Sequence, residues 1–264
     1  MSYVISWVGT KDGQGVTTSA LALAYELAID HHVLLIDADQ SGTGTLFDLL
    51  DFPEMQLSLR GMSRFAGRIS SISAEMLRQE AIQLPSRRNL SVVPGLNGIC
   101  GKPNHVLAGE LEQGNALTKA PFHFVMIDWG AAWSHAGLDS PVRAAEATCR
   151  ISDRVLVQLL DSPALLIRAI RVLQQARPVS AELVLLETRQ NQLRGELRGV
   201  LASNLPELGL SAVIPWSRRA VIKAEDDGVP MVEQGASLAR QLQIVERARL
   251  VLEARQLALT GESP

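Results

Sequence analysis

The chain has 264 residues, of which 47% are hydrophobic; this is enough to bury the core of one domain, and the composition requires no second one. A net charge of −3 and an isoelectric point near 6.0 exclude a global basic field that would hold nucleic acid. The two cysteines, Cys100 and Cys149, are too few for a disulfide framework and share no metal-ligand spacing, so we expect a reduced, cytoplasmic protein.

The N-terminal part of the chain alternates apolar runs with helical patterns. A strand is predicted over 3–8, an amphipathic helix over 17–29 and a second, wholly apolar strand over 32–39. Residues 40–88 are mixed in character and indicate helices with loops. The opening "MSYVISWVGT" lacks the basic and long apolar regions of a signal peptide. No apolar run approaches the roughly 18 residues of a membrane span, so we expect no transmembrane segment.

The alternation continues to the end of the chain. Strands are predicted over 89–95, 122–130, 153–160, 181–188 and 211–216, and helices over 163–176, 191–204 and about 236–258. Strands that alternate with helices of this length predict an α/β fold, with a doubly wound, mostly parallel sheet covered by helices on both faces. We expect residues 1–264 to form a single domain that ends in one long helix.

Three polar signals stand where predicted strands end. They are the glycine-rich "GTKDGQGVTT" after the first strand, "DAD" after the second and "DWG" at the end of the strand over 122–130. Each alone is weak, because glycine-rich turns and helix-capping aspartates are common. In an open parallel sheet, however, ligands bind beyond the carboxyl ends of the strands. The three signals together therefore predict a ligand site at this edge.

The residue types at these positions suit a nucleoside triphosphate. Gly13 and Gly15 let the backbone turn so that consecutive N–H groups face an anion at the N-terminus of the next helix. Thr17 stands where a hydroxyl would bind Mg²⁺, and Thr18 could touch a phosphate oxygen. Two carboxylates suit the second shell of that ion, and a third could orient an attacking water. These are, in that order, Asp37, Asp128 and Asp39.

At this point the sequence resembles a known family. "KDGQGVTT" (11–18) is similar to the deviant Walker A motif K-G-G-x-G-K-[ST]-[ST] of the ParA/MinD ATPases. "VLLIDADQSG" (33–42) resembles their switch I, and "FVMIDWGAA" (124–132) resembles their Walker B or switch II strand. Comparable segments follow in "SDRVLVQLLDSPALLIRAIRVLQQ" (152–175) and "VIPWSRRAVIKAEDDGVPM" (213–231).

The resemblance implies ATP and Mg²⁺ as ligands and a homodimer that closes face to face across the nucleotides. Family members hydrolyse ATP slowly and position other assemblies, such as plasmids, division septa, flagella and pili. It places Lys11 and the loop that follows around the phosphates, namely Gly13, Gln14, Gly15, Val16, Thr17 and Thr18. Lys11 takes the position of the signature lysine, which reaches the partner's phosphates and has a catalytic role there.

Two departures from the motif bear on affinity. Asp12 replaces a glycine and puts a negative charge beside the anion site, and Val16 replaces the Walker lysine. Losing one charge-assisted contact costs about 1.5–3 kcal/mol, a tenfold to more than hundredfold loss of affinity. A small uncharged residue in place of the Walker lysine is typical of the TadZ/CpaE branch of pilus assembly, which the sequence resembles most. Any ATPase activity would then be slow or absent.

The base-binding position also differs. The family often has an asparagine after the strand that matches "ELVLLETRQ", where it contacts adenine; this chain has Glu187 or Thr188 there. Glu187 could accept a hydrogen bond from the adenine amino group or simply cap the loop. Selectivity between adenine and guanine therefore stays open.

Three functions remain open. The leading hypothesis is an ATP-binding, dimerising switch or scaffold that positions a pilus, secretion or other envelope assembly, and whose partners are protein components of that assembly. The alternatives are a partition or septum-site ATPase with real turnover, and a pseudo-ATPase that acts only through protein contacts. Retention of Asp37, Asp39 and Asp128 argues against the last. We expect a cytoplasmic location, with peripheral attachment at the inner membrane face or cell pole left open.

Other charged and aromatic residues are assigned to ordinary surfaces and packing. DNA or acidic lipid could bind basic patches, but a solvated face is favoured for these residues. The closing helix mixes acidic and basic positions, so we expect it to pack on the domain rather than lie on a membrane. Trp129 and Trp133 are assigned to packing rather than to a partner surface. The basic residues in question are Arg60, Arg64, Arg68, Arg87, Arg88, Arg218, Arg219 and Lys223.

Overall fold

The computed structural model describes residues 1–39, 46, 50, 62–65, 71–95, 103–134, 140–160, 162–176, 181–186, 199–200, 203–204, 210–214 and 232–260. Its strands are β1 (Tyr3–Gly9), β2 (Val33–Asp37), β3 (Ile82–Leu84), β4 (Arg87–Val93), β5 (Phe124–Asp128), β6 (Arg154–Leu160), β7 (Ala181–Leu186) and β8 (Leu210–Ile214). Its helices are α1 (Val16–Leu27), α4 (Ala74–Glu80), α5 (Asn104–Gln113), α6 (Pro141–Ile151), α7 (Pro163–Ala176), α10 (Val232–Leu242) and α11 (Ile244–Thr260), with a 3-10 turn at Met62–Phe65.

These strands form one twisted sheet in the order β3-β4-β2-β5-β1-β6-β7-β8. All neighbouring strands are parallel except β3, which pairs antiparallel with β4 at the edge. The predicted mostly parallel sheet is confirmed. The short strand β3 was not predicted, because three residues directly before a turn carry too little periodic signal.

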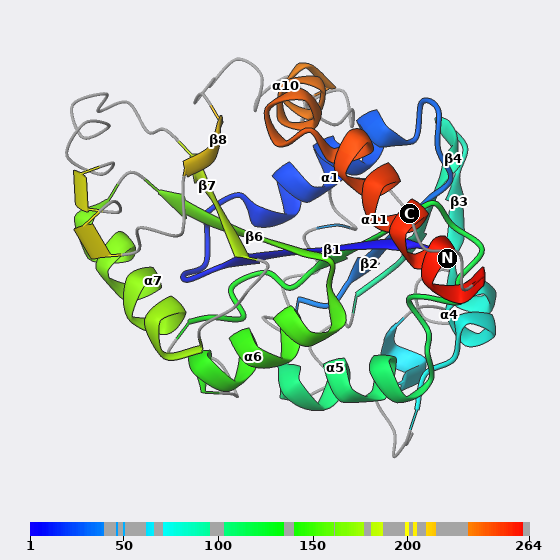
Figure 1. Cartoon of the computed structure of the whole chain (residues 1–264), viewed down its shortest axis with the longest axis horizontal. Coiled ribbons are helices and arrows are strands. Elements are labelled where there is room, and N and C mark those ends of the chain that lie inside the picture. Colours follow the sequence, from blue (N-terminus) through cyan, green and yellow to red (C-terminus); the bar gives the residue numbers. More distant parts are fainter. Residues whose placement is uncertain are drawn as a thin grey trace.

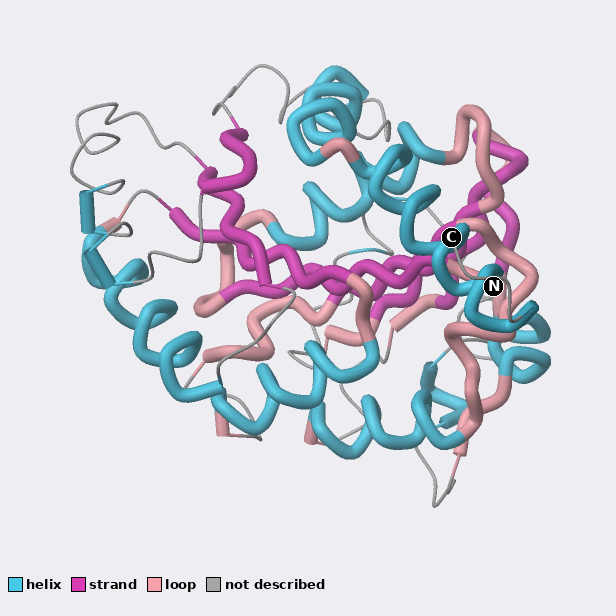
Figure 2. The backbone as a smooth tube through the Cα atoms, in the orientation of Figure 1, coloured by secondary structure: helices cyan, strands magenta, loops and turns pink. Residues whose placement is uncertain are grey.

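Helices cover both faces of the sheet. Figure 1 shows α5, α6 and α7 on one face and α1, α10 and α11 on the other, and Figure 2 shows the sheet as a band between them. Each face has its own apolar cluster, one with Leu107, Ala144 and Leu166 and one with Leu21 and Leu238. Helix α10 lies so close to α1 that a Cβ on Gly235 would be 2.1 Å from the Ala22 carbonyl oxygen. Two-sided burial explains why β1, β2 and β5 are apolar along almost their whole length.

The closing helix differs from the prediction of one helix over about 236–258. The chain forms α10 and α11, separated at Gln243, whose φ is +50°. Leu242 and Ile244 on either side of the break are both fully buried. The break frees the Leu242 carbonyl from the helix, and this carbonyl accepts a hydrogen bond from Arg154 Nη1 at 2.7 Å. None of the described helices is both long and apolar enough to cross a membrane.

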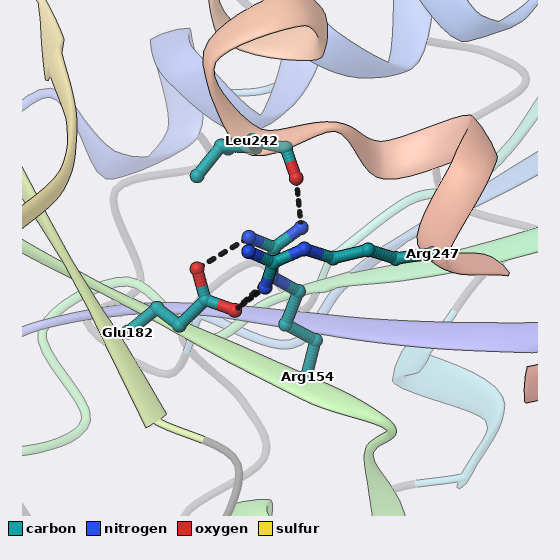
Figure 3. A network of polar contacts seen from close by, with 4 residues as sticks. All are labelled: Arg154, Glu182, Leu242 and Arg247. Atoms are coloured by element: carbon teal, nitrogen blue, oxygen red, sulfur yellow. Dashed lines mark hydrogen bonds and ion pairs between the residues drawn. The ribbon is translucent and has the colours of Figure 1, made fainter. Parts of the chain in front are cut away.

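An ion-pair network built on the buried Arg154 fastens α11 to the sheet (Figure 3). Arg154, at the start of β6, donates through Nε and Nη2 to Glu182 on β7, and Arg247 of α11 binds the same carboxylate at 2.7 Å. Burial raises the pKa of Glu182, but the hydrogen bonds from Arg154, and then the charges of Arg154 and Arg247, outweigh it and hold this pKa below its usual range. The side chain of Arg154 is only 3% exposed, and the network holds the junction between α10 and α11 against β6 and β7.

The two ends of the described chain lie side by side (Figure 1), where Arg255 donates to the Ser2 carbonyl and pairs with Asp153. Other predicted segments fall outside the described residues. Among them are most of the helix expected over 191–204 and the ends of the strands expected over 181–188 and 211–216. The helix expected over 163–176 matches α7 residue for residue.

Candidate nucleotide and metal site

The glycine loop joins β1 to α1 at the carboxyl edge of the sheet. Gly13 and Gly15 both have φ of +73°, the left-handed region that side chains rarely adopt, and Gly15 is the residue that caps α1. Among the described residues no side chain caps this helix, and no acidic residue stands in its first turn. No described side chain therefore occupies the N–H groups of the first turn, which suit an anion.

The loop is held from beneath by uncharged amides. Gln14 is 1% exposed, and its Oε1 accepts from the backbone N–H groups of Thr10 at 2.8 Å and Lys11 at 3.1 Å. Gln158 of β6 donates to the Gln14 carbonyl and accepts from the Trp7 indole N–H at 2.8 Å. Gln14 thus braces the loop, and the roles of Gln158 and Trp7 were not predicted. A glutamine inside the apolar strand "RVLVQLL" was the signal that could have found them.

Val16 fills the space under the loop with an apolar side chain. It is 5% exposed and belongs to the apolar cluster on the α1 face of the sheet. Its Cγ2 lies 2.8 Å from where a Cβ on Gly9 would stand, so the valine packs closely against the end of β1. Lys11, Asp12 and Gly13 are exposed on the outer side of the loop. Val16 therefore contributes packing at this position and no charge.

Two buried aspartates end neighbouring strands in register. Asp37 of β2 pairs with Asp128 of β5, and the two residues are 3% and 0% exposed. Oδ1 of Asp128 accepts from the Gly130 N–H at 2.9 Å, whereas Oδ2 is buried and has no hydrogen-bond partner among the described residues. Oδ1 of Asp37 accepts from the Asp39 N–H at 3.1 Å.

The burial of these carboxylates changes their acidity. Burial raises the pKa of Asp128 to about 7, although the Thr17 hydroxyl and the Gly130 N–H partly offset it. Burial and then the neighbouring charge of Asp128 raise the pKa of Asp37 well above its ordinary range. The fold therefore holds two carboxyl groups where their charges are poorly compensated by protein groups.

Asp39 lies next to this pair and is more exposed than either member. It contacts Gly130, where a Cβ would lie 2.3 Å from the Asp39 carboxyl carbon. The Gly130 carbonyl in turn accepts from the Gly9 N–H at 2.8 Å, which ties this turn to the start of the glycine loop. The structure thus brings Thr17, Asp37, Asp39 and Asp128 together beside the loop.

The unpartnered Oδ2 of Asp128 and its neighbours fit a magnesium ion. A divalent cation would compensate the charges of Asp37 and Asp128, and hydroxyl and carboxylate oxygens are the donors that Mg²⁺ prefers. The described residues contain no group of three or more His, Cys, Asp or Glu side chains that could hold a metal alone. An ion here would therefore share its coordination with phosphate and water, as Mg²⁺ commonly does.

Some of the remaining expected residues are described by the structure, and the others lie outside its described part. Trp129 and Trp133 are 1% and 0% exposed, which confirms packing rather than a partner surface. Glu187 and Thr188 lie outside the described residues. Of the basic residues, Arg87 lies 4.3 Å from the ring of Tyr25 and Arg88 is exposed. The side chains of the others, Arg60, Arg64, Arg68, Arg218, Arg219 and Lys223, lie outside the described part.

Similar proteins are found by structure and not by sequence. No protein-family model matches the chain, and no curated protein is detectably similar to it. A ParA family ATPase from Chlorobium tepidum is 17% identical with a TM-score of 0.67, over 94% of this chain and 99% of that one. The septum site-determining protein MinD from Pyrococcus horikoshii, complexed with Mg-ADP, is 17% identical with a TM-score of 0.68, over 93% and 96%. A variant of McdA from Cyanothece, complexed with ATP, is 17% identical with a TM-score of 0.64, over 94% and 96%.

At these identities the similarity establishes the fold. The chain shares its doubly wound, mostly parallel fold with the ParA family ATPase and MinD, as the sequence predicted.

The raised pKa of Asp128 leads to a prediction about stability. Below the ordinary value of 3.8 the group is protonated in both states, and between 3.8 and about 7 the free energy of unfolding falls as pH rises. Above about pH 7 Asp128 is ionised in both states, and the loss of unfolding free energy reaches its full value, on the order of 4 kcal/mol. We expect Asp128→Asn to raise the free energy of unfolding at pH 8 by up to about 4 kcal/mol, and to change it little near pH 4, in urea titrations.

Asp153→Asn is the matched control, because Asp153 accepts from the Val4 N–H and pairs with Arg255. That variant should lose stability at pH 8. An Asp128→Asn protein less stable than wild type at pH 8 would show that the buried carboxylate carries no such penalty.

Proposed function

We propose that residues 1–264 form a single ATP-binding domain of the ParA/MinD type. It acts as a dimerising switch or scaffold that positions a pilus, secretion or other envelope assembly. One observation carries the proposal. The glycine loop leads into α1, which no described side chain caps, and it stands beside the buried pair Asp37 and Asp128, in which Asp128 Oδ2 has no described partner. The ATP and Mg-ADP in two proteins of the same fold support the choice of nucleotide. Val16 supports the TadZ/CpaE branch and slow or absent hydrolysis.

The proposed roles follow from position. The phosphates bind the backbone of residues 12–18, where Thr17 binds Mg²⁺ and Thr18 contacts a phosphate oxygen. Asp37 and Asp128 orient the magnesium and its water ligands. When bound, the ion neutralises phosphate charge. Glu187 is proposed to contact the base, and protein components of the positioned assembly are the proposed partners.

The first test is binding. The wild-type protein should bind Mg-ATP in the micromolar range or more weakly, because the backbone cradle is formed but position 16 carries no charge. Val16→Lys should tighten binding roughly tenfold or more, which is the value of one charge-assisted contact. Isothermal titration calorimetry with Mg-ATP measures both affinities.

The control adds the same charge elsewhere. Val245 of α11 is 46% exposed, so Val245→Lys should leave the affinity unchanged. If the wild type shows no heat of binding at millimolar Mg-ATP and Val16→Lys does not restore it, the loop is not a nucleotide site.

Asp39 is proposed to orient the attacking water, because it is the most exposed of the three clustered carboxylates. Asp39→Ala should keep Mg-ATP affinity within about threefold and remove phosphate release in a turnover assay. Asp30→Ala, at an exposed turn after α1, should change neither quantity. A fast wild-type rate that Asp39→Ala removes would favour a partition or septum-site ATPase, whereas a slow wild-type rate that Asp39→Ala removes is expected of the proposed switch. Equal turnover rates in wild type and Asp39→Ala would show that Asp39 does not orient the water. A wild type that binds Mg-ATP without hydrolysing it would indicate a scaffold.

Lys11 is proposed to act across a homodimer. Its exposed position on the outer side of the loop leaves it free to reach a second subunit, which would complete each site from the other chain. Binding and dimerisation should then be linked. In sedimentation velocity, ATP should shift the wild type towards dimer, and Lys11→Ala should weaken both the shift and the nucleotide affinity. Lys119→Ala, another exposed lysine, should behave as wild type. Identical mass distributions for wild type and Lys11→Ala, with and without ATP, would refute the role.

A further inference from the structure

Arg168 of α7 reaches the glycine loop from a distant part of the sequence. Its Nη1 donates to the carbonyl of Thr10 at 3.3 Å, 158 residues away and at the point where β1 passes into the loop. Thr10 itself is fully buried, and its N–H is bonded to the buried Gln14 side chain. The guanidinium therefore lies against the base of the loop that is proposed to bind phosphate.

The contact with Thr10 uses one of the five N–H donors of the guanidinium. Within the described part of the chain, the structure gives Arg168 no carboxylate partner and no second hydrogen bond. The side chain is half-buried. Arg150, Arg154 and Arg255, by contrast, each bind a carboxylate. Arg168 thus has N–H donors and a charge at the loop that no described residue engages.

Apart from Lys11, the described residues of the loop and its braces carry no positive charge. Position 16 is an apolar valine packed on the sheet, position 12 is an exposed aspartate, and the buried braces Gln14, Gln158 and Trp7 are uncharged. Lys11 is the other cation on the described loop, and it is exposed on the outer side. Among the described residues, the guanidinium of Arg168 is therefore the cation that a polyphosphate in this loop would meet from within the same subunit.

We propose that Arg168 binds the phosphates of the nucleotide and supplies the positive charge that Val16 does not. An arginine suits this position better than a lysine, because its planar fork can bond a backbone carbonyl with one edge and a phosphate oxygen with another. The inference rests on the proposed nucleotide site and adds to it a ligand from α7.

A double-mutant cycle between positions 168 and 16 separates this role from simple support of the loop. Affinities of Mg-ATP and of magnesium tripolyphosphate are measured by calorimetry for wild type, Arg168→Gln, Val16→Lys and the double variant. Arg168→Gln should weaken both ligands at least tenfold in the Val16 protein, and less than threefold in the Val16→Lys background, where the new lysine provides the charge. Arg168→Lys should retain part of the affinity.

Arg171→Gln is the matched control, since Arg171 is exposed on the same helix and should not affect binding. Equal losses for Arg168→Gln with valine and with lysine at position 16 would mean that Arg168 only supports the Thr10 carbonyl, and would overturn the inference. An Arg168→Gln protein that binds Mg-ATP as tightly as wild type would also overturn the role of Arg168. Because the wild type still binds Mg-ATP in that case, the proposed function would be unaffected. If neither wild type nor Val16→Lys binds either ligand, the proposed function fails and the inference fails with it.

Discussion

The register between β2 and β5, two central strands of the sheet, places two carboxyl groups side by side where these strands end. β5 lies between β2 and β1, so Asp37 and Asp128 end adjacent strands at the carboxyl edge, directly beside the loop that follows β1. Neither group is surrounded by enough protein donors to be stable as a charged group, and one oxygen of Asp128 has no partner in the described structure. Other parts of the site lie next to this pair. Thr17 of α1 donates to Asp128, and so does the Gly130 N–H, while the missing side chain of Gly130 makes space for the Asp39 carboxyl group.

The charge balance of the site follows from the same arrangement. Asp12, Asp37, Asp39 and Asp128 outnumber the cations of the described residues around the loop, and the amides that hold the loop add no charge. A nucleoside triphosphate brings several more negative charges. Such a balance favours the magnesium complex over the free nucleotide, because the ion compensates the aspartates and the phosphates together.

The parts of this protein that could be predicted from sequence are those that depend on local pattern. Apolar runs, their spacing and the glycine loop led to the parallel sheet, to α7 and to the cluster of Thr17, Asp37, Asp39 and Asp128, because strand ends meet at one edge of the sheet. The break at Gln243 could not be predicted, since it depends on the carbonyl of Leu242 meeting Arg154, 88 residues earlier. The same holds for the contact between Arg168 and Thr10. A glutamine in the apolar strand β6 indicates a buried polar contact, but not that its partner is the Gln14 carbonyl, 144 residues away. Each of these is a side chain that meets a backbone group from another element, and such meetings leave no periodic signal.

The polar interactions divide between the two edges of the sheet. At the amino edge the charges are paired: Arg154 and Arg247 with Glu182, Arg255 with Asp153, and Arg150 with Glu112. These pairs join β6 and β7 to α11, and α6 to α5, and they fix the positions of the outer helices. At the carboxyl edge the carboxylates Asp37 and Asp128 have no cationic partner among the described residues. Stability is therefore gained at one edge, and charge is left uncompensated at the other, where ligands bind in folds of this kind. This separation explains how the fold tolerates a buried aspartate pair that a bound cation would relieve.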